Sequence, residues 1–412
     1  MTKNNCAYCG NNQVPHGINW YFESLNILLT PARQLVLYNP VTALLARLGW
    51  GRGVAKIFLA VAEGLKIITR QIDVKKCKVR RAQVLWEEAE KRGIKMQELL
   101  LFGKPFDTYI AEKFYPSSFV LNPSFLEPKL KKVRLIFSGL PRPAGYFNPW
   151  LDLMDDKWKL KEKFLKEGLP VPLGASCFSF RQAKQIFNKI RPIGNSVIVK
   201  PRAGSRGRHS TTFVSSLEEL KVAFKVAKQL CFWVMVEEQL QGPVYRATVI
   251  NFKLAGVLRG DAPQIIGDGV STVSKLIESK NQLPHPGVKN IPADQQVQRF
   301  LARQHLALAS ILPAEKTVFL SEKIGVNYGG SSREDLNICH PENTELFEYA
   351  AQVLGDPVVG FDFIIPDISV SYKTQKCGFI EVNSLPFINL HHDPLLGNPR
   401  NVAAAIWNML KL

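Results

Sequence analysis

Two short apolar runs in the C-terminal part of the chain predict a pair of buried strands. They cover 358–365 and 378–382, and each is bounded by proline, glycine or polar residues, as is typical of strands. Asp362 lies inside the first run, and Glu381 and Asn383 stand at the end of the second. Because residues i and i+2 of a strand face the same side, we expect Glu381 and Asn383 to point the same way.

These three side chains form a candidate metal site. Oxygen ligands on neighbouring strands suit a hard cation such as Mg²⁺, which takes few carboxylates and completes its shell with water and phosphate. The alternative is that Glu381 and Asn383 only cap the end of a strand. A motif this short leaves both interpretations open.

In the first third of the chain, apolar residues recur at helical spacing. The pattern predicts helices over 17–48, 53–70 and 80–92, and a mixed, proline-containing region then follows to about residue 150. The helix over 53–70 is amphipathic, so it either packs on its own domain or lies on an anionic lipid surface. Packing against a core is the more common use of such a face.

From Met154 onward, helices and strands alternate. The charged stretch that begins there predicts a helix, then a Gly-Leu-Pro turn and a strand. Further strands are expected over 196–202, 232–236 and 248–258, and helices over 216–230 and after the Gly-Asp-Gly turn at 267–269.

Lys200 lies inside the apolar strand expected over 196–202 and must reach a partner, because an isolated buried charge is costly. The sequence AGSRGRHSTT follows at 203–212. Small residues there let backbone N–H groups approach an anion closely, as in phosphate-binding loops. The spacing is neither that of a Walker loop nor that of a Rossmann loop, so a plain hairpin is the alternative.

Composition narrows the class of protein. At 412 residues the chain is too long for one ordinary domain, and two or three are expected. A hydrophobic content of 46% allows a large core. No apolar run approaches the length of a membrane span, and the N-terminal ten residues lack the apolar core of a signal peptide. Seven cysteines do not make a disulfide framework in a chain this long, which favours the reducing cytoplasm.

The formal net charge of +18 is unevenly distributed. Residues 1–150 contain 22 Lys and Arg against 10 Asp and Glu. A basic module of this kind favours an anionic partner, which is an acidic substrate, an anionic membrane surface or nucleic acid. Nucleic acid is the weakest of these, because the sequence has no RNP-like aromatic motif and no paired zinc fingers.

Cys6 and Cys9 form a CxxC pair, and His16 follows closely. These residues supply three of the four ligands of a zinc knuckle. No second CxxC follows and Cys77 stands alone, so the sequence leaves zinc binding open. Redox chemistry is less favoured, because no βαβ pattern surrounds the pair.

The region from Met154 to the C-terminus resembles the ATP-grasp ligases, and among them the ATP-grasp region of cyanophycin synthetase. Eight stretches carry the resemblance and follow the order of the family. They are VIVKP at 197–201, GRHS at 207–210, VEEQLQG at 236–242, IGDGVST at 266–272, HPEN at 340–343, FDFIIPDIS at 361–369, IEVNSLP at 380–386 and GNPRNVAAAI at 397–406.

The resemblance implies an α+β, ATP-grasp fold in which two α+β lobes grip ATP. It implies an ATP-grasp domain over 151–412, preceded by a mixed, helix-rich, basic N-terminal domain over 1–150 of the preATP-grasp type. The Mur-ligase-like half of cyanophycin synthetase is not matched, and neither is its usual N-terminal domain. Polymerisation of two amino acids is therefore not expected.

The resemblance also implies which residues meet ATP and its metal. It places Mg²⁺, or Mn²⁺ in its place, on Asp362, Glu381 and Asn383. A lid over the transferred phosphate corresponds to 204–210, and a hinge whose backbone meets adenine corresponds to 237–240. The nucleotide-binding residues implied in this way are Lys157, Lys200, Gly204, Ser205, Arg206, Gly207, Arg208, Glu237, Glu238, Gln239 and Leu240. Val244 occupies the position of the carboxylate that holds the ribose in relatives.

The function expected is that of an ATP-dependent carboxylate–amine ligase, which forms an amide or peptide bond through an acyl phosphate. Its partners would be ATP, a carboxylate and an amine of amino-acid or peptide type. Arg246, Arg259 and Arg333 are candidate catalytic residues, because a guanidinium binds an acyl phosphate or a carboxylate through two hydrogen bonds. Ligases of this type need no nucleophile, so His340 of the Cys339-His340 pair is interpreted as a helix start.

A second hypothesis assigns the chain to another class. The ATP-grasp part would then be an ATP-binding module, and the basic N-terminal third would dock it on an anionic membrane surface or on nucleic acid.

Overall fold

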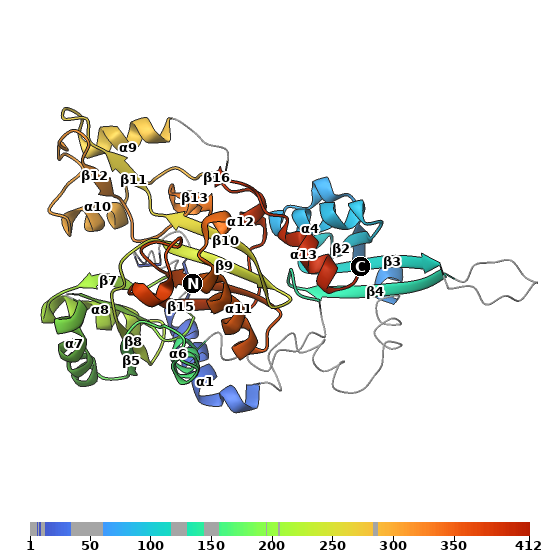
Figure 1. Cartoon of the computed structure of the whole chain (residues 1–412), viewed down its shortest axis with the longest axis horizontal. Helices are drawn as coiled ribbons and strands as arrows, with labels where there is room; N and C mark the ends of the chain where they lie inside the picture. Colours follow the sequence, from blue (N-terminus) through green and yellow to red (C-terminus); the bar gives the residue numbers. More distant parts are fainter. Residues whose placement is uncertain are drawn as a thin grey trace, which may run out of the picture.

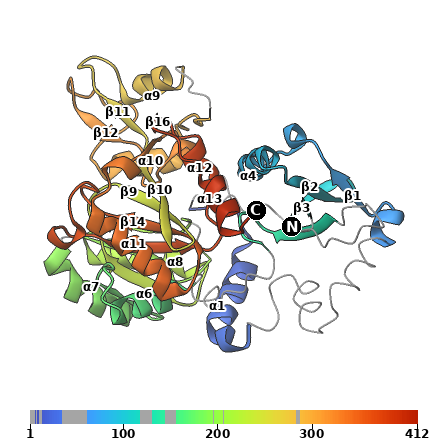
Figure 2. The same ribbon diagram turned by 45° about the vertical axis from the view of Figure 1, so that its right-hand side comes forward.

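The computed structural model describes residues 6, 8–9, 13–33, 61–116, 130–143, 156–194, 196–204, 207–282 and 287–412. Two bodies lie side by side (Figures 1 and 2). The described residues between 61 and 143 form the smaller body, and residues from 156 onward form the larger one. Helix α1 (His16–Arg33) lies against the larger body.

The smaller body is a four-stranded antiparallel sheet in the order β1-β2-β3-β4, with helix α4 packed on it. Its elements are β1 (Ile68–Gln71), α4 (Arg80–Lys91), β2 (Lys95–Leu101), β3 (Lys104–Pro116) and β4 (Leu130–Ser138). Phe102 and Gly103 join β2 to β3, and both have positive φ angles, 48° and 74°. Positive φ at both central residues is the geometry of a two-residue hairpin turn.

The predicted mixed character of this part is confirmed, and the helix over 80–92 is confirmed as α4. The helix over 17–48 is confirmed as far as Arg33, and residues 34–60 lie outside those that the structure describes. The helix over 53–70 is wrong at its C-terminal end, because Ile68–Gln71 pairs with β2. Ile67, Ile68 and Thr69 are β-branched, and such side chains favour a strand where a partner strand is available.

A shared hydrophobic core joins the smaller body to the C-terminal helix α13 (Val402–Met409). Trp407 is buried, and its ring lies edge-on to that of Phe137 in β4 with 5.8 Å between centroids. Its Nε1–H donates to the backbone carbonyl of Leu85 in α4 at 2.9 Å. Both views show α13 beside α4. The two bodies therefore do not have separate cores.

The first lobe of the larger body is a four-stranded sheet in the order β5-β8-β6-β7, with two helices packed on it. The elements are β5 (Gly174–Cys177), α7 (Phe180–Gly194), β6 (Val197–Pro201), β7 (Thr211–Val214), α8 (Leu217–Lys228) and β8 (Val234–Glu238). Helix α8 starts with a capping box in which Ser216 and Glu219 satisfy each other's backbone N–H groups. The strands predicted over 196–202 and 232–236 and the helix over 216–230 are confirmed.

The second lobe is a six-stranded sheet in the order β15-β14-β9-β10-β13-β16. Its strands are β9 (Val244–Ile250), β10 (Lys253–Asp261), β13 (Ser331–Glu334), β14 (Val358–Ile364), β15 (Gly378–Asn383) and β16 (Leu396–Gly397). Helices α6 (Lys157–Lys166) and α11 (Pro341–Leu354) pack on one face, around Phe164, Phe347 and Phe361. The short helix α12 (Asn389–His392) follows β15.

The single strand predicted over 248–258 is wrong, since this stretch contains the turn of the hairpin between β9 and β10. Asn251 and Phe252 form that turn with φ angles of 52° and 60°. Asparagine tolerates the left-handed region better than most residues. The apolar residues on both sides of this turn nevertheless indicated one continuous strand. The two strands around Asp362 and Glu381 are confirmed as β14 and β15.

A small module extends from the second lobe, at the upper left of Figure 1. It consists of β11 (Gln264–Ile266), α9 (Val273–Asn281), α10 (Gln295–Ala302) and β12 (Thr317–Phe319). It has a core of its own that includes Ile277, Val297 and Leu301. The helix predicted after the Gly-Asp-Gly turn is confirmed as α9, with Thr272 as its N-cap.

Among the described residues, no helix combines the length and the apolar character needed to cross a bilayer.

Candidate functional site

The three predicted metal ligands lie on two paired strands of the second lobe. β14 and β15 run antiparallel, with Asp362 directly opposite Glu381 and Gly360 opposite Asn383. Directly opposed residues share a face of the sheet, as do residues two apart in one strand. The register therefore brings all three side chains to the same face.

A β-bulge in β15 makes this arrangement compatible with the core. Phe363 pairs with Phe379 while its neighbour Asp362 pairs with Glu381, so Ile380 is an extra residue. Without the bulge, Phe379 and Glu381 would face the same side. The bulge keeps Phe379 in the core beside α11 and leaves Glu381 on the opposite face, as bulges do beside functional sites.

Arg246 of β9 joins this face as the cross-strand partner of Asp362. Its Nη2–H donates to Oδ2 of Asp362 at 2.9 Å, and its Nε–H contacts the other carboxylate oxygen. Burial raises the pKa of Asp362, and Glu381 raises it further, whereas Arg246 lowers it. The Nη1 atom of Arg246 is buried and has no hydrogen-bond partner among the described residues, so this donor can serve a bound anion.

Lys157 reaches the same face from the start of α6. Its Nζ lies 3.9 Å from Oε1 of Glu381. The helix start is fixed by Asp156, whose side chain caps the N-terminus and accepts two hydrogen bonds of 2.7 Å from Arg202 at the end of β6. This ion pair links the first lobe to the helix that carries Lys157.

Lys200 of β6 is paired with the buried carboxylate of Glu237 in β8. The Nζ atom of Lys200 lies 2.7 Å from Oε2 of Glu237, and Nζ of Lys161 lies 2.6 Å from Oε1. Despite the opposing effect of burial, these two lysines lower the pKa of Glu237 to about 2. Burial lowers the pKa of Lys161. The predicted phosphate lysine therefore has a buried anionic partner in the protein itself.

The predicted hinge 237–240 lies where the chain leaves the first lobe for the second. Glu237 and Glu238 end β8, and β9 of the six-stranded sheet begins at Val244. Between them, Gly242 has a φ of 119°, and a Cβ there would lie 2.8 Å from the carbonyl oxygen of Ile365. Only glycine fits this close approach. The hinge therefore borders the sheet that carries Asp362 and Glu381.

The predicted lid 204–210 connects β6 to β7. Ser205 and Arg206 lie outside the described residues. Gly204 and Gly207 have φ angles of 68° and 76°, in the left-handed region that glycine adopts without strain. Arg208 is buried and donates to the carbonyl of Gly204 at 3.1 Å.

The structure does not bring Arg259 and Arg333 together with Arg246. They are cross-strand partners of each other in β10 and β13, and Arg259 is also opposite Tyr245. Because Tyr245 and Arg246 are adjacent in β9, this row faces the other side of the sheet. Each arginine is paired locally, Arg259 with Asp261 and Arg333 with Asp335, through contacts of 2.7 Å.

The interpretation of the Cys339-His340 pair as a helix start is confirmed. His340 is the N-cap of α11, and its Nδ1 accepts the backbone N–H of Glu342 at 3.2 Å. Burial raises the pKa of Cys339 to about 11, so its thiol is not activated as a nucleophile.

The donor set fits a hard divalent cation. Two carboxylates and one amide oxygen on a single face are the ligands that Mg²⁺ takes when water and phosphate complete its shell. Arg246 and Lys157 stand beside them, where negative charge of a nucleotide or an acyl phosphate would lie. Asp362, Glu381 and Asn383 would hold the ion.

Two residues of this region were not singled out from the sequence. Lys161 lies one helical turn after Lys157, and its place in a lysine-rich stretch gave no signal that it is buried against Glu237. His209 was assigned only to the GRHS stretch, and the structure places it against Cys6, Cys9 and His16. Such contacts between distant segments leave no periodic pattern in a sequence.

Comparison with solved structures identifies the fold class of the chain. No family model matches the chain. The structure is similar to a bifunctional glutathione synthetase from Pasteurella multocida, with a TM-score of 0.52 and 24% identity, over 80% of this chain and 43% of that chain. With the two lobes described above, the chain has the ATP-grasp fold, and the predicted fold class is confirmed. The structural match covers 80% of this chain, which is more than residues 156–412 make up. The similarity in fold therefore extends into the first third of the chain.

The sequence comparison then identifies the more specific resemblance. The chain is 31% identical to a cyanophycin synthetase from Synechocystis sp. over 268 residues, which are 63% of this chain and 30% of the relative. A glutathione biosynthesis bifunctional protein from Clostridium perfringens is 26% identical over 266 residues, 63% of this chain and 34% of that protein. The resemblance to the ATP-grasp region of cyanophycin synthetase is confirmed. The chain spans about a third of the length of these relatives.

Proposed function

We propose that this protein is an ATP-dependent carboxylate–amine ligase. The observation that carries the proposal is the single sheet face on which Asp362, Glu381 and Asn383 meet Arg246 and Lys157. Phosphoryl transfer needs positioning and positive charge more than covalent chemistry from the protein. That face supplies ligands for a divalent cation together with two side chains that neutralise phosphate.

Each residue has a defined task in this reaction. Lys157 and Lys200 neutralise the nucleotide phosphates, with the hinge 237–240 beside the adenine. When bound at Asp362, Glu381 and Asn383, Mg²⁺, or Mn²⁺ in its place, screens the charge of the transferred phosphate. The free Nη1 donor of Arg246 binds the substrate carboxylate and then the acyl phosphate.

The chemistry proceeds in two steps. The substrate carboxylate attacks the γ-phosphorus of ATP, which releases ADP and gives an acyl phosphate. An amine then attacks the acyl carbon, the C–O bond to phosphate breaks, and the nitrogen loses a proton as the amide forms. Arg259 and Arg333 take no part in this scheme, because they face the other side of the sheet.

The substrates are proposed by chemical class. The acid and the amine are of amino-acid or peptide type, which the names of the relatives support, since cyanophycin and glutathione are built from amino acids. Because the Synechocystis relative is a synthetase and the Clostridium relative is a biosynthesis protein, they favour the ligase over a binding module that only docks on a membrane or on nucleic acid.

The experiment that tests the proposal measures ADP release by the full chain with Mg²⁺, ATP and pairs of amino acids or short peptides. We expect ADP release that needs both an acid and an amine, and a product whose mass equals their sum minus one water. Hydroxylamine should replace the amine and trap the acyl phosphate as a hydroxamate. Binding of ATP without ADP release or hydroxamate for any acid would contradict the proposal and favour a nucleotide-binding module.

A further inference from the structure

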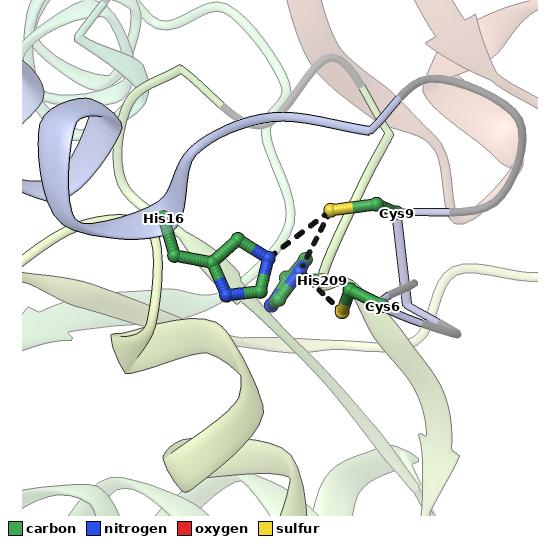
Figure 3. Close-up of side chains that lie close together, drawn as sticks. All are labelled: Cys6, Cys9, His16 and His209. Atoms are coloured by element: carbon green, nitrogen blue, oxygen red, sulfur yellow. Dashed lines mark hydrogen bonds between the residues drawn. The ribbon is translucent and has the colours of Figure 1, made fainter. Parts of the chain in front are cut away.

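Four potential metal ligands converge at the junction between the N-terminal segment and the first lobe (Figure 3). They are Cys6, Cys9, His16 and His209, and their ligand atoms all lie within 4.8 Å of one another. Three come from the first 16 residues and the fourth from the loop between β6 and β7. Cys9 and His209 are buried, and Cys6 and His16 are half-buried.

The distances between these atoms match a tetrahedral metal site. The sulfur of Cys9 lies 3.3 Å from Nε2 of His16 and 3.3 Å from Nε2 of His209, and the sulfur of Cys6 lies 3.5 Å from the same atom of His209. With Zn–S bonds of about 2.3 Å and Zn–N bonds of about 2.0–2.1 Å, tetrahedral ligands are separated by about 3.6 Å from sulfur to nitrogen. The three measured sulfur–nitrogen distances are therefore close to those of a Cys₂His₂ zinc site, and no other pair of ligand atoms is more than 4.8 Å apart.

The imidazole of His209 is oriented for metal binding. Its Nδ1 lies 2.8 Å from the backbone carbonyl oxygen of Val226 in α8, a contact that requires a proton on Nδ1. Nε2 is then unprotonated, and Figure 3 shows its contacts with the sulfurs of Cys6 and Cys9. Histidines that bind metals are commonly held by such a hydrogen bond from the second ring nitrogen.

The backbone around the ligands is also fixed. The N–H of Cys9 donates to the carbonyl of Cys6 at 3.1 Å, which closes the CxxC segment into a tight turn. The N–H of His209 donates to the carbonyl of Tyr8 at 3.3 Å. His209 has a φ of 53°, a strained conformation for a residue other than glycine.

Helix α1 extends the contact between the N-terminal segment and the first lobe beyond the four potential ligands. The side chain of Asn19 donates to the carbonyl of Leu230 at 3.1 Å, and the backbone N–H of Phe232 donates to Oγ of Ser24 at 2.9 Å. Ile27 packs in a small core with Ala203 and Cys231. The N-terminal segment is thus attached to both ends of the loop region, through Ala203 and through His209.

We propose that Cys6, Cys9, His16 and His209 bind one Zn²⁺ ion as a closed structural site that fixes the N-terminal segment to the loop 204–210. All four coordination positions are filled by protein, as in structural rather than catalytic zinc sites. A mixed sulfur and nitrogen set in tetrahedral geometry selects zinc over Mg²⁺, so this site and the Asp362 site would hold different metals. The assignment of this loop as the lid of the ATP site rests on the proposed function.

The test measures metal in the full chain purified without chelators. We expect about one zinc per chain, and replacement by Co²⁺ should give the intense visible bands of a tetrahedral site together with a sulfur-to-cobalt charge-transfer band. His209→Asn should lose the zinc and the cobalt spectrum, because asparagine tolerates the left-handed backbone but offers no imidazole. Cys9→Ser should do the same.

Two control variants match these changes. His305 is exposed and has a φ of 57°, so His305→Asn repeats the His209 change away from the cluster. Cys339→Ser repeats the cysteine change in a residue outside it. Both should keep one zinc. A full chain without zinc that gives no tetrahedral cobalt spectrum, or a His209→Asn variant that keeps both, would overturn the site.

Hydrogen exchange tests the second half of the proposal. Removal of zinc by a chelator should raise amide exchange in 16–33 and 207–214, and leave α11 unchanged. Equal exchange with and without zinc would show that the metal does not fix the segment to the loop. Neither experiment uses nucleotide or substrate, so the zinc site can fail or stand independently of the ligase activity.

Discussion

At the scale of single residues, the candidate site depends on charges that are buried in opposed pairs. Asp362 is held by Arg246, and Glu237 is held by Lys161 and Lys200. A buried carboxylate without such partners would be protonated or would destabilise the fold by several kcal/mol. The two lysines lower the pKa of Glu237 and so favour its ionised form, whereas at Asp362 the contact with Arg246 opposes the rise in pKa that burial causes. One donor of Arg246 is left free.

The metal ligands give the first prediction. Glu381→Gln and Asn383→Ala should each lower ADP release at least about a hundredfold, because loss of a charge-stabilising group in a transition state costs about that much. Circular dichroism should show both variants folded. Glu162→Gln, on the exposed side of α6, is the matched control and should keep its activity. Near wild-type turnover in either ligand variant would remove that residue from the site.

The pH dependence of stability follows from Glu237. Its pKa is about 2 in the folded protein and about 4.3 when unperturbed. A carboxylate with a lowered folded pKa contributes stability that is fully present above the unfolded value and is lost as pH falls toward the folded one. We therefore expect the free energy of unfolding to fall by a few kcal/mol between pH 5 and pH 2.

Urea titrations of the wild type and of Glu237→Gln measure this contribution. The variant should be less stable at pH 7 by about 3–5 kcal/mol, because Lys161 and Lys200 lose their common anion. Its stability should also depend less on pH between 5 and 2. Parallel pH curves for the two proteins would show that Glu237 is not the group responsible.

At the scale of elements, the loop between β6 and β7 connects two candidate sites. Its first part, with Gly204 and Gly207 at left-handed φ, belongs to the predicted lid. Its last part carries His209, which is buried against Cys9 and hydrogen-bonded to Val226. We therefore expect any lid movement within 204–210 to be confined to the part before His209.

This division leads to a prediction about nucleotide binding. ATP with Mg²⁺ should slow amide exchange in 204–208, because a lid closes over the bound phosphates. Exchange in 209–214 should change little, since that part is already fixed. Hydrogen-exchange mass spectrometry with and without a non-hydrolysable ATP analogue measures both segments. No change in either segment would favour a plain hairpin over a lid.

At the scale of the whole molecule, the smaller body and the ATP-grasp body share a core. Trp407 packs against both Phe137 and α4. A polar bridge adds to this contact, because the buried Arg142 donates to the carboxylate of Asp356 at 2.7 Å and to the carbonyl of Ser384 at 3.1 Å. Cutting the chain near residue 150 would expose this apolar surface. The boundary between 1–150 and 151–412 remains a prediction.

The shared core predicts cooperative unfolding. Trp407→Ala should lower the free energy of unfolding by about 3–5 kcal/mol, as is typical of a large buried aromatic side chain. It should destabilise the smaller body and the second lobe together, in one thermal transition. Trp20→Ala, at a partly exposed position of α1, is the control and should cost much less. Two separate transitions in the Trp407 variant would show that the bodies fold independently.

Local sequence patterns predicted many elements of the ATP-grasp lobes. Short, bounded apolar runs predicted β14 and β15, strand alternation placed Glu381 and Asn383 on one face, and helical spacing predicted α8. These signals are local, because strand alternation and helical periodicity depend on residues a few positions apart. The prediction for the first third of the chain was weaker. Its sheet depends on the pairing of β2 with β3 and of β3 with β4, which local patterns do not reveal.

Which distant side chains meet followed from the packing of the elements and not from any local pattern. Arg246, Arg259 and Arg333 were equivalent candidates in the sequence, and the register of the six-stranded sheet left Arg246 alone beside Asp362. In the same way, the CxxC pair lacked a fourth ligand until the fold brought His209 to it. Contacts between residues about 200 positions apart depend on the packing of whole elements, which no local pattern in a sequence encodes.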